Sequence, residues 1–365
     1  MLQVLPHRAE HVGSLLRSAA LKAARAEHAR GALSDAGLKE VEDREILRLI
    51  DRQHEAGMQT VTDGEVRRES WHVDFLTHLD GVEAIRPEAG YSFHGSVTNF
   101  AIPHVVGPLG FSGHPMLAHF AFLRQHARGM PKMTIPSPSA LHFRFGRQVV
   151  AENVYPDMDA FYDDLAGAYA KAIAAFGEVG CRYLQLDEVY LAYLCDPAQR
   201  EDLKTRGEDP ETLPRTYAKL INRALAGAPD GMTIGMHLCR GNFRSTYVAS
   251  GGYEPVAEML FNEIGVDAYF MEFDTERAGG FEPLRFVPKG KTVVLGLVTT
   301  KVGQLEERSA ILRRIEDAAR FVPIEQLCLS PQCGFASTED GNDLAEEAQW
   351  AKLRLVADIA AEVWG

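Results

Sequence analysis

The chain has 365 residues, of which 46% are hydrophobic and 24% charged, and its formal charge is −13. This composition is typical of a globular protein that forms one large α/β domain or two ordinary ones, and it excludes a disordered or fibrous chain. The negative charge argues against nucleic acid as a main partner, since phosphate backbones call for clustered Lys and Arg.

Membrane insertion, secretion and a disulfide scaffold are disfavoured as well. No stretch approaches the roughly eighteen uninterrupted apolar residues of a membrane span. The opening residues MLQVLPHRAEH lack the charged head and long apolar run of a signal peptide. The five cysteines are an odd number and are spread thinly, which favours reduced thiols in the cytoplasm.

Short apolar, β-prone runs recur along the chain, and each leads into a polar loop and then a helical pattern. A weak run precedes Val12, and seven clearer ones follow it at 59–62, 132–135, 183–186, 232–236, 267–271, 292–297 and 325–329. Amphipathic helices are predicted between the later runs, at about 157–178, 212–227, 253–264, 304–320 and 341–362.

Alternating strands and helices indicate a parallel sheet with right-handed crossovers. Eight such units predict a closed (β/α)8 TIM barrel, formed by residues 1–365 as a single domain. An open, doubly wound sheet is the alternative, but no GxGxxG motif follows the first strand. The stretch from about 81 to 130 has turn residues and no clear repeat, and we interpret it as an insertion after the second strand.

Unusual polar residues follow the predicted strands, where a barrel builds its active site. His237 and Cys239 are two positions apart, so on a strand their side chains face the same side. Glu272 ends a largely apolar run, where a carboxylate is costly to bury unless it binds something. Cys333 follows the last strand. Each residue alone also fits a bland interpretation, as a buried cysteine or a satisfied core histidine.

Taken together, one imidazole, two thiols and one carboxylate predict a tetrahedral zinc site. Iron is disfavoured because iron–sulfur clusters normally take four thiolates. With two thiolates and a carboxylate, the zinc complex would carry a charge of about −1, which suits a nucleophilic thiolate better than a hydroxide. Exchange of Glu272 for an incoming thiol would keep that charge unchanged.

These residues resemble the catalytic, C-terminal domain of cobalamin-independent methionine synthase, here in a single-barrel form. The resemblance covers nearly the whole chain, from HVGSLLRS at 11–18 to the C-terminal helix. In that family zinc is held by a His-x-Cys pair, a Glu after the next strand and a Cys after the last strand. The resemblance therefore implies that the zinc ligands, of which the carboxylate is also catalytic, are His237, Cys239, Glu272 and Cys333.

The resemblance also implies the residues that bind a substrate amino acid. HVGSLL matches the family segment that holds the amino-acid carboxylate, which implicates Gly13 and Ser14, with Val12 supplying backbone. DGEVRRESW matches the segment whose Glu binds the ammonium group, here Glu65. LQLDEVYL supplies Asp187 as a second ammonium partner and catalytic residue. Paired carboxylates beside backbone donors suit a free amino acid.

The implied activity is that of a zinc-dependent S-methyltransferase that activates the thiol of homocysteine and forms methionine. The methyl donor is left open, because family members carry a second barrel that helps bind folate and this chain is one barrel long. Thr299, Thr300 and Lys301 stand where the family has a histidine after the seventh strand. The loop after the third strand, PSPSALHF at 136–143, lacks the Trp on which folate stacks in the family, and His142 or Phe143 could substitute for it. The donor could be methylfolate, a methylated corrinoid on a carrier protein, or another small methyl carrier. A homo-oligomer is also possible.

Three other functions fit parts of the sequence. A zinc alkyltransferase could act on another thiol, such as a sulfonate like coenzyme M, although Glu65 and Asp187 favour an amino acid. A non-catalytic zinc-binding or amino-acid-binding barrel would bind homocysteine without consuming it. A decarboxylase of the uroporphyrinogen type would contain no zinc.

Overall fold

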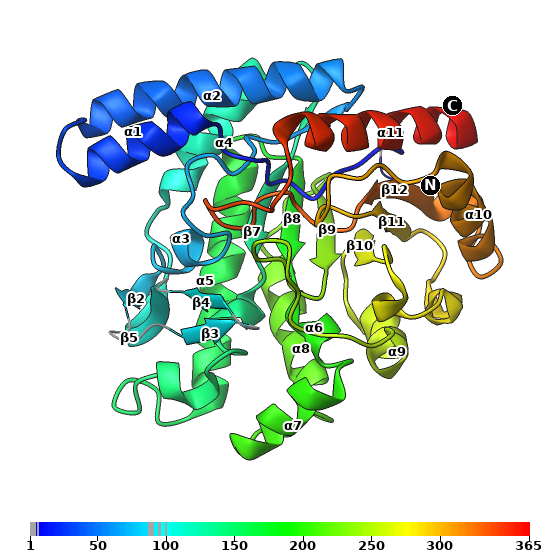
Figure 1. Ribbon diagram of the computed structural model, residues 1–365. Coiled ribbons are helices and arrows are strands. Elements are labelled where there is room, and N and C mark those ends of the chain that lie inside the picture. The colour runs from blue at the N-terminus through cyan, green and yellow to red at the C-terminus, as the bar shows by residue number, and fades with distance from the viewer. Residues whose placement is uncertain (1–4, 6, 87–90, 94–95, 99–100) are drawn as a thin grey trace.

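Six parallel strands form the centre of the molecule. The computed structural model describes residues 5, 7–86, 91–93, 96–98 and 101–365. Neighbouring strands pair in chain order (Figure 1), from β7 (Met133–Pro136) through β8 (Tyr183–Asp187), β9 (Thr233–Leu238), β10 (Ala268–Glu272) and β11 (Thr292–Val298) to β12 (Leu327–Pro331).

A two-stranded parallel pair extends this sheet at one edge. β1 (Thr60–Val61) pairs with β6 (Met130–Pro131), and β6 is separated from β7 by a single residue, Lys132. The Lys132 amide donates to the Val61 carbonyl at 2.8 Å, so the pairing continues across that residue. β1 therefore takes the place next to β7.

The N-terminal segment 8–15 closes the ring between β12 and β1. The Glu10 amide donates to the Leu329 carbonyl at 2.9 Å, in β12. The Leu15 amide donates to the Gly64 carbonyl at 3.0 Å, just beyond β1. Eight strand positions thus surround one interior, and the predicted (β/α)8 barrel is confirmed.

The chain between β1 and β6 contains antiparallel strands, in contrast to the barrel. β2 (Asp80–Ile85) pairs with β5 (Ile102–Gly110), and β3 (Tyr91–Phe93) pairs with β4 (Ser96–Thr98). Part of the insertion predicted at about 81–130, namely 87–90, 94–95 and 99–100, lies outside the described residues.

Helices cover the outside of the ring. All five helices predicted from sequence lie within about five residues of the expected bounds, and the largest difference is at the start of the fifth. They are α5 (Met158–Glu178), α8 (Leu213–Leu225), α9 (Glu254–Glu263), α10 (Arg308–Ala318) and α11 (Glu346–Trp364). The others are α1 (Ala19–Ala29), α2 (Asp35–Glu55), α3 (Val73–Leu76), α4 (Pro115–His126), α6 (Tyr190–Tyr193) and α7 (Pro197–Thr205). Across the described ranges, none is long and apolar enough to cross a membrane.

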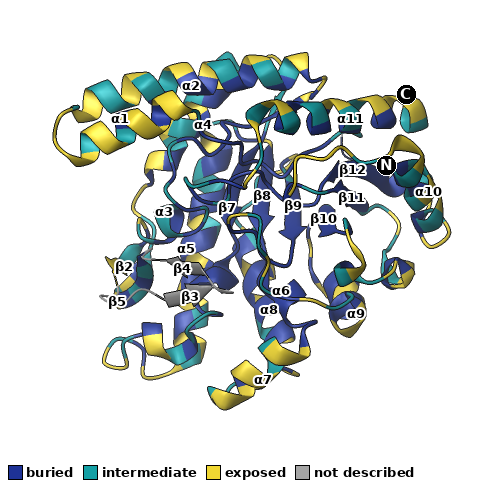
Figure 2. Cartoon of the chain, in the orientation of Figure 1, coloured by how far each residue is buried: buried dark blue, intermediate teal, exposed yellow. Residues whose placement is uncertain are grey.

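Successive side chains on each barrel strand point alternately into the barrel interior and outward to the layer beneath the helices. Figure 2 shows the strands of the six-stranded sheet buried and the outer faces of α1 and α2 exposed. Leu184 and Leu186 join the large core that includes the helices, whereas Tyr183 and Phe270 belong to a separate, smaller cluster. Gly235 gives the Phe270 ring its space, because a Cβ there would lie 3.0 Å from that ring.

Lys132 places a fully buried ammonium group in this interior. Its Nζ donates to Glu10 Oε2 at 3.2 Å, to Gln185 Oε1 at 3.1 Å and to the His11 carbonyl. The same nitrogen lies 4.5 Å from the centre of the Phe270 ring. Its partners come from the N-terminal segment, β8 and β10, so one charge connects several parts of the barrel wall.

We expect Lys132→Met to lose about 3–5 kcal/mol of unfolding free energy, because the buried Glu10 carboxylate would lose its cation. The double variant Glu10→Gln/Lys132→Met should lose clearly less, since it leaves no unpaired charge. Urea denaturation measures both. Breaking the exposed Arg308–Glu362 pair is the control and should cost less than about 1 kcal/mol. A double variant as unstable as the single one would contradict this account.

Candidate metal centre and substrate pocket

A cavity of about 720 Å³, including the open space at its mouth, lies where several barrel strands end. Seven of the residues implicated by sequence line it: Val12, Ser14, Glu65, Asp187, His237, Cys239 and Cys333. The other wall residues include Trp71, His72, Arg144, Tyr193 and Asn242. Segments distant in the chain therefore meet at one site, as parallel strand ends in a barrel require.

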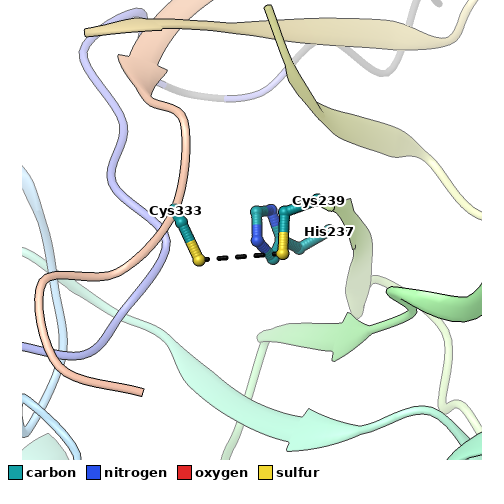
Figure 3. A group of neighbouring side chains, drawn as sticks. All are labelled: His237, Cys239 and Cys333. Carbon is teal, nitrogen blue, oxygen red and sulfur yellow. Dashed lines mark hydrogen bonds between the residues drawn. The ribbon is translucent and has the colours of Figure 1, made fainter. Parts of the chain in front are cut away.

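Three potential metal ligands gather at this cavity. His237 belongs to β9, and Cys239 is the first residue after that strand. Cys333 lies two residues beyond the end of β12. All three are buried, and their ligand atoms lie within 4.8 Å of one another. The two sulfur atoms are 3.7 Å apart, and Figure 3 shows the side chains pointing toward one another.

The two thiols differ in acidity because they contact each other. Contact with Cys239 lowers the pKa of Cys333 well below its usual value, and His237 strengthens the effect. The same contact, together with burial, raises the pKa of Cys239. Burial opposes charge on His237, but Cys333, Asp187 and Glu272 together outweigh burial and raise the pKa of the imidazole. The group thus favours an anionic sulfur beside a cation.

The three side chains fit a borderline-soft divalent ion. Within the described part of the chain, neither ring nitrogen of the buried His237 has a hydrogen-bond partner. A buried polar atom without a partner is costly, and coordination to a metal would satisfy one nitrogen. One imidazole and two sulfurs are ligands that zinc takes readily.

Glu272, the fourth ligand implied by sequence, is directed to other partners. Its Oε1 accepts hydrogen bonds from Arg277, at 2.5 Å from Nη2 and 3.2 Å from Nε. Its Oε2 accepts from the Arg240 amide at 2.7 Å. Burial would raise the pKa of Glu272, but the positive charges of Lys301 and Arg240, with that of Arg277, hold it below its usual value.

Glu65 is buried in the cavity wall in an uncommon backbone conformation, with φ of 58°. Its Oε1 accepts a hydrogen bond from the Thr134 hydroxyl at 2.8 Å and lies 3.5 Å from Arg68 Nη1. Its amide donates to Asp63 Oδ1 at 2.9 Å. Burial raises the pKa of Glu65. The strained backbone and costly carboxylate suggest a functional position.

Asp187 is held by a residue that the sequence interpretation missed. Gln185 Nε2 donates both to Asp187 Oδ1 at 2.8 Å and to the Val12 carbonyl at 2.7 Å. Burial raises the pKa of Asp187 to about 7, and Glu65 adds to this shift. Gln185 lies two residues before Asp187 on the same strand face, so the alternation of β8 could have identified it.

Gly13 and Ser14 pack closely against neighbouring walls. Gly13 has a φ of 140°, and a Cβ there would lie 2.7 Å from the Thr134 side chain. The Phe335 amide donates to the Ser14 carbonyl at 2.9 Å. A Cβ on Gly334 would lie 1.9 Å from Ser14 Oγ, so both glycines permit these close approaches. The segment is therefore held beside the loop that carries Cys333.

The two aromatic residues suggested as donor-stacking groups are engaged elsewhere. Phe143 stacks on Tyr190 at 4.7 Å, and His142 Nδ1 is 2.9 Å from the Tyr217 hydroxyl. Neither is among the residues that line the cavity, whereas Trp71 is.

After β11, at the site of the family histidine, Lys301 Nζ donates to the Gly241 carbonyl and to Asn242 Oδ1, both at 3.1 Å. Lys301 therefore braces the loop that follows Cys239.

Comparison with known proteins gives consistent matches. A family model described as "Cobalamin-independent synthase, Catalytic domain" matches residues 8–362. "Uncharacterized protein YxjH" of Bacillus subtilis (strain 168) is 50% identical over 98% of this chain and 95% of its own. A "5-methyltetrahydropteroyltriglutamate--homocysteine methyltransferase" of Shewanella oneidensis is 25% identical over 88% of this chain and 39% of its own.

A solved structure from Listeria monocytogenes matches over the whole chain. It is provisionally described as a vitamin-B12 independent methionine synthase and is 40% identical in sequence. The match covers 100% of this chain and 99% of that one, with a TM-score of 0.80.

The backbone at Glu65 should favour glycine. We expect Glu65→Gly to be more stable than Glu65→Ala by about 1 kcal/mol, because both remove the carboxylate but only glycine adopts a positive φ freely. Exposed Glu40, in helix α2, is the control, and there alanine should be the more stable by about 1 kcal/mol. Urea denaturation of the four variants measures both differences, and the same order at both sites would contradict strain at Glu65.

Proposed function

The chain belongs to the cobalamin-independent synthase catalytic-domain family, and from this premise we propose that it is a zinc-dependent methyltransferase that converts homocysteine to methionine. The observation that carries this proposal is the group of His237, Cys239 and Cys333 in the same cavity as two buried carboxylates. An imidazole and two sulfurs would bind zinc, and the carboxylates would bind the cationic end of an amino acid.

Zinc, when bound, would lower the pKa of a coordinated thiol so that its sulfur reacts as a thiolate. The side chains of this protein would orient the rest of the substrate. Glu65 and Asp187 would accept hydrogen bonds from the ammonium group, while Ser14 and the backbone at Gly13 would receive the carboxylate. Gln185 would fix the direction of Asp187, because it holds both that carboxylate and the Val12 carbonyl. The substrate sulfur would then point toward the metal ligands.

The charges of the pocket favour an amino acid over a sulfonate. A sulfonate would meet the carboxylates of Glu65 and Asp187 as a like charge, whereas an ammonium group would neutralise them. We also propose that the protein works in the cytoplasm, where Cys239 and Cys333 would stay reduced. A methylfolate is the donor in the printed name of the Shewanella relative, and a methylcorrinoid is the alternative for this chain.

The proposal is tested by incubating the zinc-loaded protein with homocysteine and, separately, methylfolate, methylcorrinoid and small methyl donors. We expect methionine, measured by mass spectrometry, from at least one donor. Cys239→Ser and Cys333→Ser should lose both zinc, measured by elemental analysis, and methionine formation. Cys195→Ser is the control, because Cys195 is buried outside the metal group and should keep both.

Each outcome of this experiment has a distinct meaning. Methionine from methylfolate alone would identify a compact methionine synthase, and methionine from methylcorrinoid alone would indicate a partner-dependent enzyme. Homocysteine binding without methionine from any donor would favour a binding protein. Full activity without metal would refute the zinc mechanism.

Asp187→Asn should weaken homocysteine binding roughly 10- to 100-fold, the usual effect of losing a charge-assisted hydrogen bond. The measurement is isothermal titration calorimetry of the zinc-loaded protein. 4-Mercaptobutyrate, which is homocysteine without its amino group, should bind the variant and the original protein alike. Equal weakening for both thiols would mean that Asp187 acts on the metal centre and not on the ammonium group.

A further inference from the structure

Arg277 and the Arg240 amide together occupy both oxygens of Glu272. The side chain of Glu272 is fully buried, and that of Arg277 is 13% exposed. Two guanidinium nitrogens reach one carboxylate oxygen, and the Arg240 amide reaches the other at 2.7 Å. The carboxylate therefore has a set of partners distinct from the group formed by His237, Cys239 and Cys333.

The guanidinium of Arg277 is itself held from several sides. It lies 4.3 Å from the centre of the Tyr247 ring, and its Nη2 is 3.4 Å from Asp274 Oδ1. The carbonyl of Arg277 accepts a hydrogen bond from the Gly251 amide at 2.9 Å. A planar guanidinium packed on a ring loses little further freedom when it binds a carboxylate. The Arg277 guanidinium is thus a pre-positioned hydrogen-bond donor for the Glu272 carboxylate.

We infer that Arg277 is a positioning residue that competes with the metal for the Glu272 carboxylate and that receives this carboxylate whenever a thiol takes its place on the metal. This inference rests on the proposed zinc function. An incoming thiolate would replace the carboxylate on the metal, and the number of negative charges around the ion would stay the same. The released carboxylate remains buried, where an unpaired charge is costly, unless a cation receives it. Arg277 provides that cation.

The inference predicts two opposite effects of equal size. Arg277 stabilises the released carboxylate both in the metal-free protein and in the complex with thiol. Loss of Arg277 should therefore make zinc bind more tightly, because its competitor for Glu272 is gone. The same loss should make homocysteine bind less tightly, because the displaced carboxylate would lack a cation that donates hydrogen bonds to it. The two changes share one free energy, so their factors should match.

The test compares Arg277→Met with the unmodified protein. Zinc affinity is measured by competition with a chromogenic chelator, and homocysteine affinity by calorimetry of the zinc-loaded protein. We expect Arg277→Met to bind zinc roughly tenfold more tightly and homocysteine roughly tenfold more weakly, at the lower end of the effect of losing a hydrogen bond to a charged group. The affinities of Arg277→Lys should lie between those of Arg277→Met and those of the unmodified protein. Arg285→Met is a matched control, because Arg285 packs on Phe286 at 4.2 Å and pairs with Glu254, and should change neither affinity.

A second variant guards against misfolding of the first. Tyr247 is 45% exposed, so Tyr247→Leu removes the surface under Arg277 at little risk to folding. Tyr247→Leu should shift both affinities in the same directions as Arg277→Met, by a smaller factor.

X-ray absorption at the zinc edge of the zinc-loaded protein gives an independent measurement. When homocysteine binds, one oxygen ligand of zinc should be replaced by sulfur.

The outcomes separate this inference from the proposed function. If zinc and homocysteine affinities fall together in Arg277→Met, or neither changes, Arg277 is only structural and the inference fails while the function stands. An oxygen ligand retained on zinc after homocysteine binds would also overturn it. If the unmodified protein binds no zinc, the proposed function fails, and this inference fails with it.

Discussion

The ammonium group of Lys132 is a constraint on which the barrel and its site both depend. A charge inside the ring is tolerated only because Glu10, Gln185 and the His11 carbonyl surround it. Those contacts hold the irregular N-terminal segment against the regular strands and complete the wall. Gln185 then uses its amide nitrogen to bind Asp187 and the Val12 carbonyl. The position of Asp187 in the cavity wall therefore follows from the way that one buried cation is neutralised.

The buried carboxylates and sulfurs around the cavity depend in the same way on neighbouring positive charges. The carboxylates and sulfurs of the cavity are buried, so each needs a positive partner or a proton. Burial raises the pKa of Asp187 to about 7, while the cations around Glu272 lower the pKa of that group. Asp187 is thus ready to receive a cationic ligand, whereas Glu272 already has cationic partners. The two carboxylates differ in their neighbours, and under the proposed function this difference would separate a substrate-binding carboxylate from an exchangeable metal ligand.

The barrel and the gathering of His237, Cys239 and Cys333 at one cavity could be predicted from sequence, because strand runs and the ends of parallel strands follow simple periodic rules. The partners of those residues could not. Arg277 lies in a short 3-10 helix (Glu276–Ala278), and its guanidinium contacts both Glu272 and the Tyr247 ring; no periodicity of the sequence encodes these contacts. His142 and Phe143 were suggested as stacking groups from chain position alone, yet tertiary packing directs both to neighbouring tyrosines. Local pattern identifies strand ends, but long-range contacts decide how each side chain is oriented.

A barrel with a polar interior offers a way to change chemistry without changing the wall. Outward residues such as Leu184 and Leu186 pack against the helices, so they fix the positions of the strands. Inward residues on the same strand, Gln185 and Asp187, hydrogen-bond to each other instead, and Asp187 lines the cavity. Because the two sets alternate, an inward substitution alters charge and ligand choice while the outer packing persists.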